Sequence, residues 1–176
     1  MVNLNRILFA TDFSKSAAAA RAMAQMFASR FDAELHIIHV VSDLSLQVPE
    51  FGMGLSFPGF ADATAEHRKE TSEQTMRALE AELEPDWRDA HRAVLTPRFG
   101  TPFLEIIRYA REHDIDLIVV GSHGRTGLAH VLLGSVAERV VRKAPCPVLT
   151  VRPDGSGEDG DNTDYSRFKV HPLPVG

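Results

Sequence analysis

Short runs of β-branched and apolar residues alternate with segments of helical periodicity along most of this chain, and this alternation limits the fold more than any other feature. The apolar runs predict five strands, at 7–10, 35–41, 93–99, 117–121 and 147–152. The segments between them predict helices, at 14–31, 62–83, 101–113 and 135–144. Several of the strands are apolar throughout, which is typical of a parallel sheet buried on both faces. We therefore predict an α/β fold: a five-stranded, parallel, open sheet of the doubly wound, Rossmann-like kind, with helices on both faces.

All of these elements fall within residues 1–152, which are expected to form one domain because 176 residues suffice for one well-buried core. The remainder, 153–176, carries five acidic residues between Asp154 and Asp164 with no basic residue among them, and it lacks apolar periodicity. We predict a mobile acidic tail there.

Composition and charge exclude several classes of function. The chain has no run of about eighteen apolar residues, so no membrane span is expected. Its formal net charge of −5 argues against nonspecific binding to nucleic acid, which depends on basic residues. The N-terminal residues show no export signal, and the single cysteine, Cys146, cannot form an internal disulfide. We expect a cytoplasmic protein in which Cys146 is a buried structural thiol.

The stretch GSHGRTGLAHVLLGS, at 121–135, places several glycines between a predicted strand and a predicted helix. In an open α/β sheet, ligands bind beyond the carboxyl ends of the strands, where the strand order reverses. Gly121 and Gly124 are expected to allow positive φ and close approach of a ligand, and Gly134 and Ser135 to open a helix whose free N–H groups attract phosphate. Alternatively, these glycines only turn the chain and cap the helix. Neither GxGxxG nor GxxxxGK[ST] occurs, so the standard dinucleotide and P-loop motifs are absent.

The chain resembles the universal stress protein family, in its ATP-binding branch. The resemblance covers residues 3 to about 152 and is carried by RILFATDFS, LHIIHVV and the spaced signature G-x-x-G, nine residues, G-[ST]. Here that signature is supplied by Gly121, Gly124, Gly134 and Ser135. The resemblance implies ATP as ligand, with Mg²⁺ held through the phosphates, and a homodimer formed through the strand at 148–152.

The resemblance also implies which residues contact the nucleotide. The adenine and ribose are expected to lie against Ala10, Thr11, Asp12 and Val40. Gly121 and Gly124 are expected to border the ribose and phosphates. Phosphate contacts are expected from Gly134, Ser135 and Val136, with Arg125 as a basic contact and His123 facing either the phosphates or solvent.

Asp12 also has physical support, because a carboxylate at the end of the first strand can accept hydrogen bonds from a ribose. The alternative is that Asp12 caps the first helix, a role that Ser14 could share. A catalytic nucleophile is not predicted, because phosphotransferases that use such an aspartate carry a second one two residues later, where this chain has Ser14. No catalytic residue is therefore assigned.

His36 and His39 look like a metal pair, but their odd spacing on a strand points them to opposite faces of the sheet. We expect ordinary packing or hydrogen bonding from them and assign no protein metal site. The loop at 42–61, which contains PEFGMGLSFPGF, is interpreted as a lid over the site, a partner surface or a loosely packed insert.

These observations predict an ATP-binding universal stress protein that acts as a nucleotide-dependent regulatory or stress-response module, with a protein partner that the sequence does not name. Two alternatives remain at this stage. One is a slow ATPase or phosphotransferase, and the other is a nucleotide-independent interaction module that uses the apolar loop and the edge strand.

Overall fold

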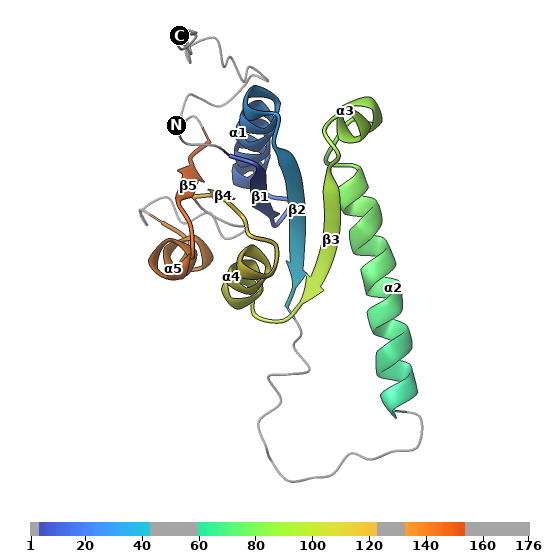
Figure 1. Cartoon of the computed structure of the whole chain (residues 1–176). Helices are drawn as coiled ribbons and strands as arrows, with labels where there is room; N and C mark the ends of the chain where they lie inside the picture. The colour runs from blue at the N-terminus through green and yellow to red at the C-terminus, as the bar shows by residue number, and fades with distance from the viewer. Residues whose placement is uncertain (1–3, 43–59, 123–132, 154–176) are drawn as a thin grey trace, which may run out of the picture.

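The computed structural model describes residues 4–42, 60–122 and 133–153, and of 60–64 only the backbone. A five-stranded sheet forms its centre, with strands β1 (Arg6–Thr11), β2 (Glu34–Val41), β3 (Val94–Phe99), β4 (Leu117–Gly121) and β5 (Val148–Val151). The strand order is β3-β2-β1-β4-β5, and every neighbouring pair is parallel (Figure 1). The predicted fold is confirmed, and the order reverses between β1 and β4.

The helices are α1 (Lys15–Phe31), α2 (Phe60–Glu80), α3 (Pro85–Ala90), α4 (Pro102–Glu112) and α5 (Ser135–Lys143). The short α3 was not predicted, because the sequence analysis placed no element between the helix at 62–83 and the strand at 93–99. In the structure Pro85 is also the first residue of α3. The partly buried Trp87 packs α3 against the core and stacks on the His91 ring, with 4.0 Å between ring centroids.

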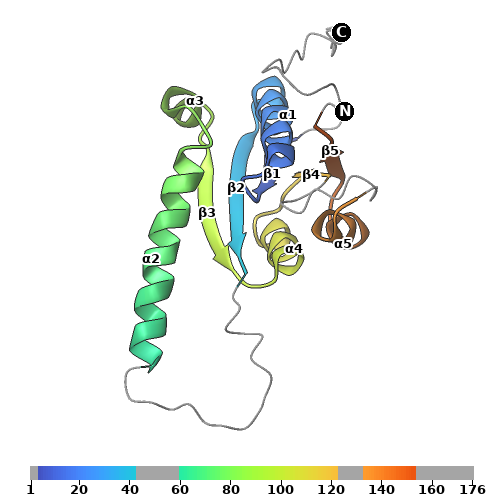
Figure 2. The ribbon, with the colours of Figure 1, turned by 180° about the vertical axis from the view of Figure 1, so that it is seen from behind.

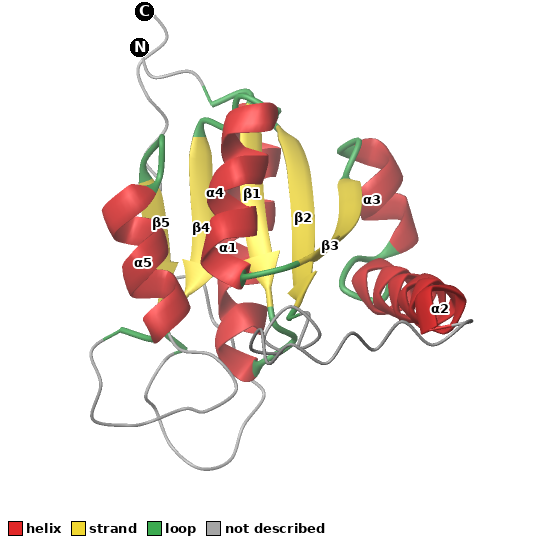
Figure 3. Ribbon diagram, turned by 90° about the horizontal axis from the view of Figure 1, so that it is seen from below, coloured by secondary structure: helices red, strands yellow, loops and turns green. Residues whose placement is uncertain are grey.

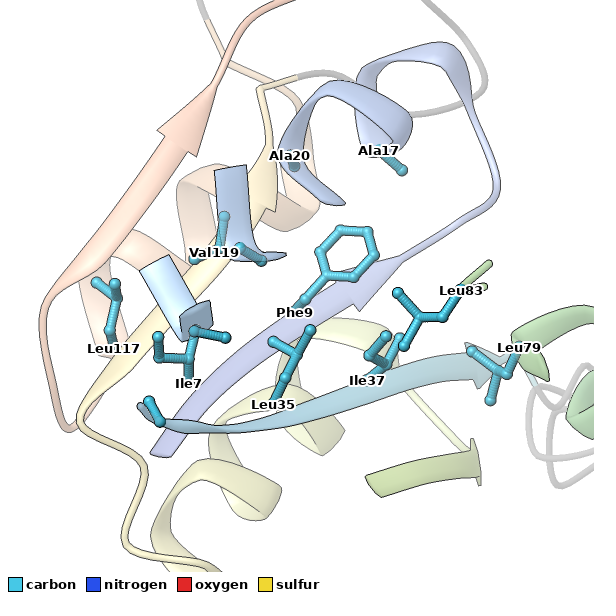
Figure 4. Close-up of a cluster of buried hydrophobic side chains, with 13 residues drawn as sticks. Ile7, Phe9, Ala17, Ala20, Leu35, Ile37, Leu79, Leu83, Leu117 and Val119 are labelled. Atoms are coloured by element: carbon cyan, nitrogen blue, oxygen red, sulfur yellow. The ribbon is translucent and has the colours of Figure 1, made fainter. Parts of the chain in front are cut away.

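The sheet separates two apolar cores. One lies between the sheet and the α1 and α2 side, and Figure 4 shows Ile7, Phe9, Leu35 and Ile37 pointing into it. The other lies under α4 and α5 and includes Leu8, Ile38, Ile106 and Val140. Figure 3 shows α1 and α4 on opposite sides of β1. This covering of both faces explains why the strands are apolar throughout.

Small side chains hold α1 close to the sheet. Its buried face is made largely of alanines, none of them more than 3% exposed: Ala17, Ala20, Ala24 and Ala28. Because alanine methyl groups are short, the helix backbone lies near β1 and β4, and the start of α1 is fixed beside the carboxyl ends of both strands.

Helix α2 runs beside β3, and its N-terminal part extends past the carboxyl ends of β2 and β3 (Figures 1 and 2). It therefore forms a wall next to the edge of the sheet where ligands are expected. None of the helices in the described ranges combines the length and the apolar character needed to cross a bilayer.

Cys146 is only partly exposed and packs against the core under α4 and α5. The thiol was predicted to be buried and is instead only partly buried, in the segment that leads into the edge strand β5. Burial still raises the pKa of the Cys146 thiol above its ordinary value.

Candidate functional site

A cavity of about 870 Å³ lies at the carboxyl ends of β1, β2 and β4, next to the reversal in strand order. The predicted site residues that fall within the described part of the chain all line it: Ala10, Thr11, Asp12, Val40, Gly121, Gly134, Ser135 and Val136. The other three predicted residues, His123, Gly124 and Arg125, lie outside the described residues. The fold thus gathers residues from four separate segments of the sequence around one hollow.

The turn between β1 and α1 is fixed by its own polar side chains. Ser14 is the N-cap of α1, and its hydroxyl accepts a hydrogen bond from the Ala17 N–H at 3.2 Å. The Asp12 carboxylate accepts from the Ser14 N–H at 3.0 Å. The alternative in which Asp12 caps the helix is therefore wrong, because Ser14 fills that position. Asp12 instead stabilises the turn through its hydrogen bond with the Ser14 N–H, and it lines the cavity.

Phe13, in the same turn, has a φ of 62°, in the left-handed region that non-glycine residues rarely adopt. Its N–H donates to the Thr11 hydroxyl at 3.0 Å, which helps to hold this conformation. The Phe13 ring lies against the His39 ring, with 4.5 Å between the centroids, and both line the cavity. Backbone strain of this kind often accompanies a functional site.

Gly121 is required for a different reason from the one predicted. Its φ is not positive, and the conformational freedom expected of it is not used. A Cβ at this position would lie 2.7 Å from the Ser16 hydroxyl oxygen and 2.9 Å from the Ser16 carbonyl carbon. Gly121 therefore permits close contact between β4 and the first turn of α1, at the floor of the cavity.

Helix α5 begins at the cavity. Gly134 is its N-cap, and no side chain caps this helix end in the described structure. The Gly134 N–H donates to the Ser122 carbonyl at 2.7 Å, which ties the start of α5 to the end of β4. The first-turn N–H groups of Ser135 and Val136 carry the partial positive charge of a helix N-terminus beside the hollow. This end of the cavity is suited to an anion.

The two histidines of β2 point to opposite faces, as predicted. The His39 Nδ1–H donates to the Thr11 carbonyl at 2.7 Å, on the α1 side. His36 lies on the α4 side, where its Nδ1 is 2.8 Å from the Tyr109 hydroxyl. Burial lowers the pKa of His36, and nearby Glu34 opposes that shift. Within the described residues, no three His, Cys, Asp or Glu side chains cluster in a way that could hold a metal ion.

Sequence reasoning missed the wall that α2 contributes. One face of this helix lines the cavity through residues spaced three and four apart: Thr71, Gln74, Thr75 and Ala78. A signal was present, because Thr75 stands one turn before the fully buried Leu79, on the stripe that faces the core. A polar residue on the apolar stripe of a helix indicates that the stripe does not pack only against apolar side chains at that position.

The chemistry available in the described lining is that of a binding site. Asp12 is the single ionisable carboxylate in this part of the lining, and no lysine or arginine joins it there. The other groups are hydroxyls, one side-chain amide, the His39 imidazole, backbone N–H groups, the Phe13 ring and apolar surface from Ile38, Val40 and Val120. This combination suits a ligand with an anionic end and a flat apolar part.

A family model and several known proteins are similar to this chain in sequence. A family model described as the universal stress protein family matches residues 3–152. Universal stress protein MJ0531 of Methanocaldococcus jannaschii is 37% identical over 147 residues, covering 84% of this chain and 81% of that protein.

Two solved structures extend the likeness to three dimensions. The structure of MJ0577, also from M. jannaschii, has a TM-score of 0.71 at 27% identity and covers 88% of this chain and 100% of its own. A universal stress protein solved in complex with cAMP has a TM-score of 0.55 at 22% identity, over 85% of this chain and 98% of its own, and at that identity the likeness is one of fold. By its sequence and its fold, the chain belongs to the universal stress protein family.

Proposed function

We propose that this protein binds ATP in the cavity at the carboxyl edge of the sheet and acts as a nucleotide-dependent regulatory or stress-response module. The observation that carries the proposal is the meeting of β1, β2, β4 and the start of α5 around one cavity of about 870 Å³. An uncapped helix N-terminus, a carboxylate and apolar surface occur together there. A nucleotide needs these three kinds of contact.

The phosphates fit the α5 end of the cavity. The first-turn N–H groups at Ser135 and Val136 are donors that a phosphate accepts from, and the helix dipole favours its negative charge. Gly134 has a φ of −67° and a ψ of 154°, so its lack of a side chain is not needed for its backbone conformation. We infer that its small size keeps the approach to these N–H groups open.

The sugar and base fit the remaining surface. Asp12 is positioned at the end of β1, where a carboxylate can accept hydrogen bonds from ribose hydroxyls. Ile38 and Val40 supply apolar surface for a base on the side of β2. Mg²⁺ in this proposal is held by the ATP phosphates and water, as is usual for this ion, and neutralises part of the phosphate charge.

The proposal includes a homodimer. β5 has one strand neighbour in the described sheet, β4, and all four of its residues are partly exposed. An apolar edge strand of this kind invites pairing with another strand, and a second copy of the chain provides an identical one. We place the function in the cytoplasm, where ATP is available, and expect nucleotide-dependent contact with a protein partner.

A protein of the same architecture has been solved in complex with cAMP, which is an adenine nucleotide. The proposal is for binding and not for turnover, since Asp12 has no second carboxylate beside it in the described lining to serve as a base.

Substitution at the start of α5 tests the proposal. Gly134→Val adds a branched side chain at a backbone conformation that valine adopts readily, so the fold should be retained while phosphate access is blocked. Arg142→Val is the matched control, because it places the same side chain on the exposed last turn of the same helix. In calorimetric titrations with ATP and Mg²⁺, Gly134→Val should lose binding and Arg142→Val should keep it. Equal affinity in both variants would remove the α5 end from the site.

A further inference from the structure

Helices α4 and α5 carry a net charge opposite in sign to that of the whole chain. They pack against each other on the same side of the sheet (Figures 1 and 2). The chain has a formal net charge of −5. These two helices nevertheless contain more basic than acidic residues: Arg108, Arg111, Arg139, Arg142 and Lys143 against Glu105, Glu112 and Glu138. Such a local excess of positive charge attracts acidic chains.

The acidic residues of the two helices leave part of this positive charge without a counterion. Each of the three carboxylates is paired with an arginine, in the pairs Glu105–Arg108, Glu138–Arg142 and Glu112–Arg98. Three basic residues remain that no carboxylate of the described ranges pairs with: Arg111, Arg139 and Lys143. All three are exposed, so an acidic segment can reach them.

Phe103 of α4 holds two of these cations together. The Arg139 guanidinium carbon lies 5.0 Å from the centroid of the Phe103 ring, and the Lys143 Nζ lies 5.8 Å from it. Arg139 and Lys143 are one turn apart on α5, where like charges repel each other unless an anion lies near both. We call Phe103, Arg111, Arg139 and Lys143 the basic face.

The chain leaves the described structure close to the start of α5. The carbonyl of Val151, the last residue of β5, accepts from the Ser122 N–H at 2.7 Å. The Ser122 carbonyl in turn accepts from the N–H of Gly134, the N-cap of α5, at 2.7 Å. The described chain ends at residue 153. Beyond it, residues 154–164 contain five acidic residues and no basic one.

This acidic segment is long enough to reach the basic face. Helix α5 has nine residues, and at about 1.5 Å per residue it is about 13 Å long. An extended chain covers about 3.3 Å per residue, so about four residues span the helix. A single surface ion pair contributes little, but a covalent tether gives a segment an effective concentration on the order of millimolar. Several weak pairs can then act together.

We infer that the acidic segment at 154–164 docks on the basic face through ion pairs with Arg139 and Lys143. The docked segment covers this face and keeps other acidic chains off it. The inference goes beyond the proposed function and does not depend on it, because the residues of the basic face are not among those that line the cavity.

The test uses amide chemical shifts of the full chain, labelled with ¹⁵N, and a synthetic peptide with the sequence of residues 154–164 as the reference for an undocked segment. In about 0.1 M salt, the shifts of 154–164 in the wild-type protein should differ from those of the peptide. The difference should disappear in about 1 M salt, where the screening length falls from about 10 Å to about 3 Å. Arg139→Gln combined with Lys143→Gln should abolish it in low salt, because both charges are lost.

Lys69→Gln combined with Arg77→Gln is the matched control. It removes the same charge from exposed positions of α2, which packs on the other face of the sheet, and should preserve the shift difference. Peptide-like shifts in the wild-type protein in low salt would overturn the inference, since the segment would then be undocked. Wild-type shifts in the variant that lacks Arg139 and Lys143 would also overturn it, because the segment would then contact another surface. Both results would leave the proposed ATP site untouched.

Discussion

Replacing Gly121 with alanine tests the role that the structure gives to this glycine. The alanine Cβ would lie 2.7 Å from the Ser16 hydroxyl oxygen, 2.9 Å from the Ser16 carbonyl carbon and 3.0 Å from its carbonyl oxygen. These distances are much shorter than a van der Waals contact between carbon atoms, which is about 3.5 Å or more. The hydroxyl can rotate away, but the two backbone atoms belong to the first turn of α1 and can move only with the helix.

The expected cost follows from this geometry. Adding a methyl group to a packed site that must shift typically costs about 1–3 kcal/mol. For a domain of this size, such a loss lowers the melting temperature by roughly 2–12 °C. Ser16→Ala removes the closest of the three atoms but leaves both backbone atoms, so it should recover only a minor part of the loss in the double variant.

Urea unfolding of the wild-type protein, Gly121→Ala, Ser16→Ala and the double variant gives the free energy of each and the coupling between the two sites. A wild-type stability for Gly121→Ala would refute the close-packing account. Full rescue by Ser16→Ala would show that the hydroxyl alone was in conflict, and that the backbone of α1 lies farther from β4 than the structure has it.

Two further predictions concern the pH dependence of stability and the assembly. Burial lowers the pKa of His36 below its ordinary value of 6.5, so the unfolded chain binds more protons than the folded one just below that pH. The contribution of His36 to stability is therefore complete above pH 6.5 and is lost as the pH falls from there through the lower pKa of the folded state. Urea midpoints at about pH 7.5 and about pH 5.5 should differ less in His36→Gln than in the wild-type protein, and an unchanged difference would exclude His36 as the source. The Pro147 carbonyl, just before β5, accepts from the Ile118 N–H, and the Val151 carbonyl accepts from the Ser122 N–H just after β4. Residues 147, 149 and 151 therefore direct their backbone groups toward β4, and Thr150 directs its N–H toward the open edge of the sheet. Thr150→Pro should convert the proposed dimer to a monomer in light-scattering measurements while Thr150→Ser does not, and a persistent dimer would place the interface elsewhere.

The parts of the fold that depend on local pattern were predictable. Each strand has an apolar run long enough to be recognised, and the observed bounds differ from the predicted ones by a few residues at most. The N-cap at Thr101 and the first position at Pro102 follow from residue type alone. The fold class also predicted at which edge of the sheet the site lies, because parallel strands bring their carboxyl ends together. Ala10, Val40 and Gly121 do meet at that edge.

The parts that depend on three-dimensional packing were not predictable. Thr75 reaches the cavity only because α2 packs against β2 and β3, and no local pattern gives the place of a helix relative to a strand end. Gly121 looked like a residue for conformational freedom, but the atoms that exclude a side chain come from Ser16, far away in the sequence. The roles of Asp12 and Ser14 were open for a similar reason, since either residue type can cap a helix and only the geometry selects Ser14.

The most direct test of ATP binding begins with protein purified without added nucleotide. The protein is denatured, the released small molecules are identified by mass and absorbance, and protein found empty is titrated with ATP and Mg²⁺. We predict either bound adenine nucleotide approaching one per chain, or saturable binding of added ATP that Gly134→Val abolishes. A protein that releases no nucleotide and binds no added ATP would contradict the account, and the cavity would then need another ligand.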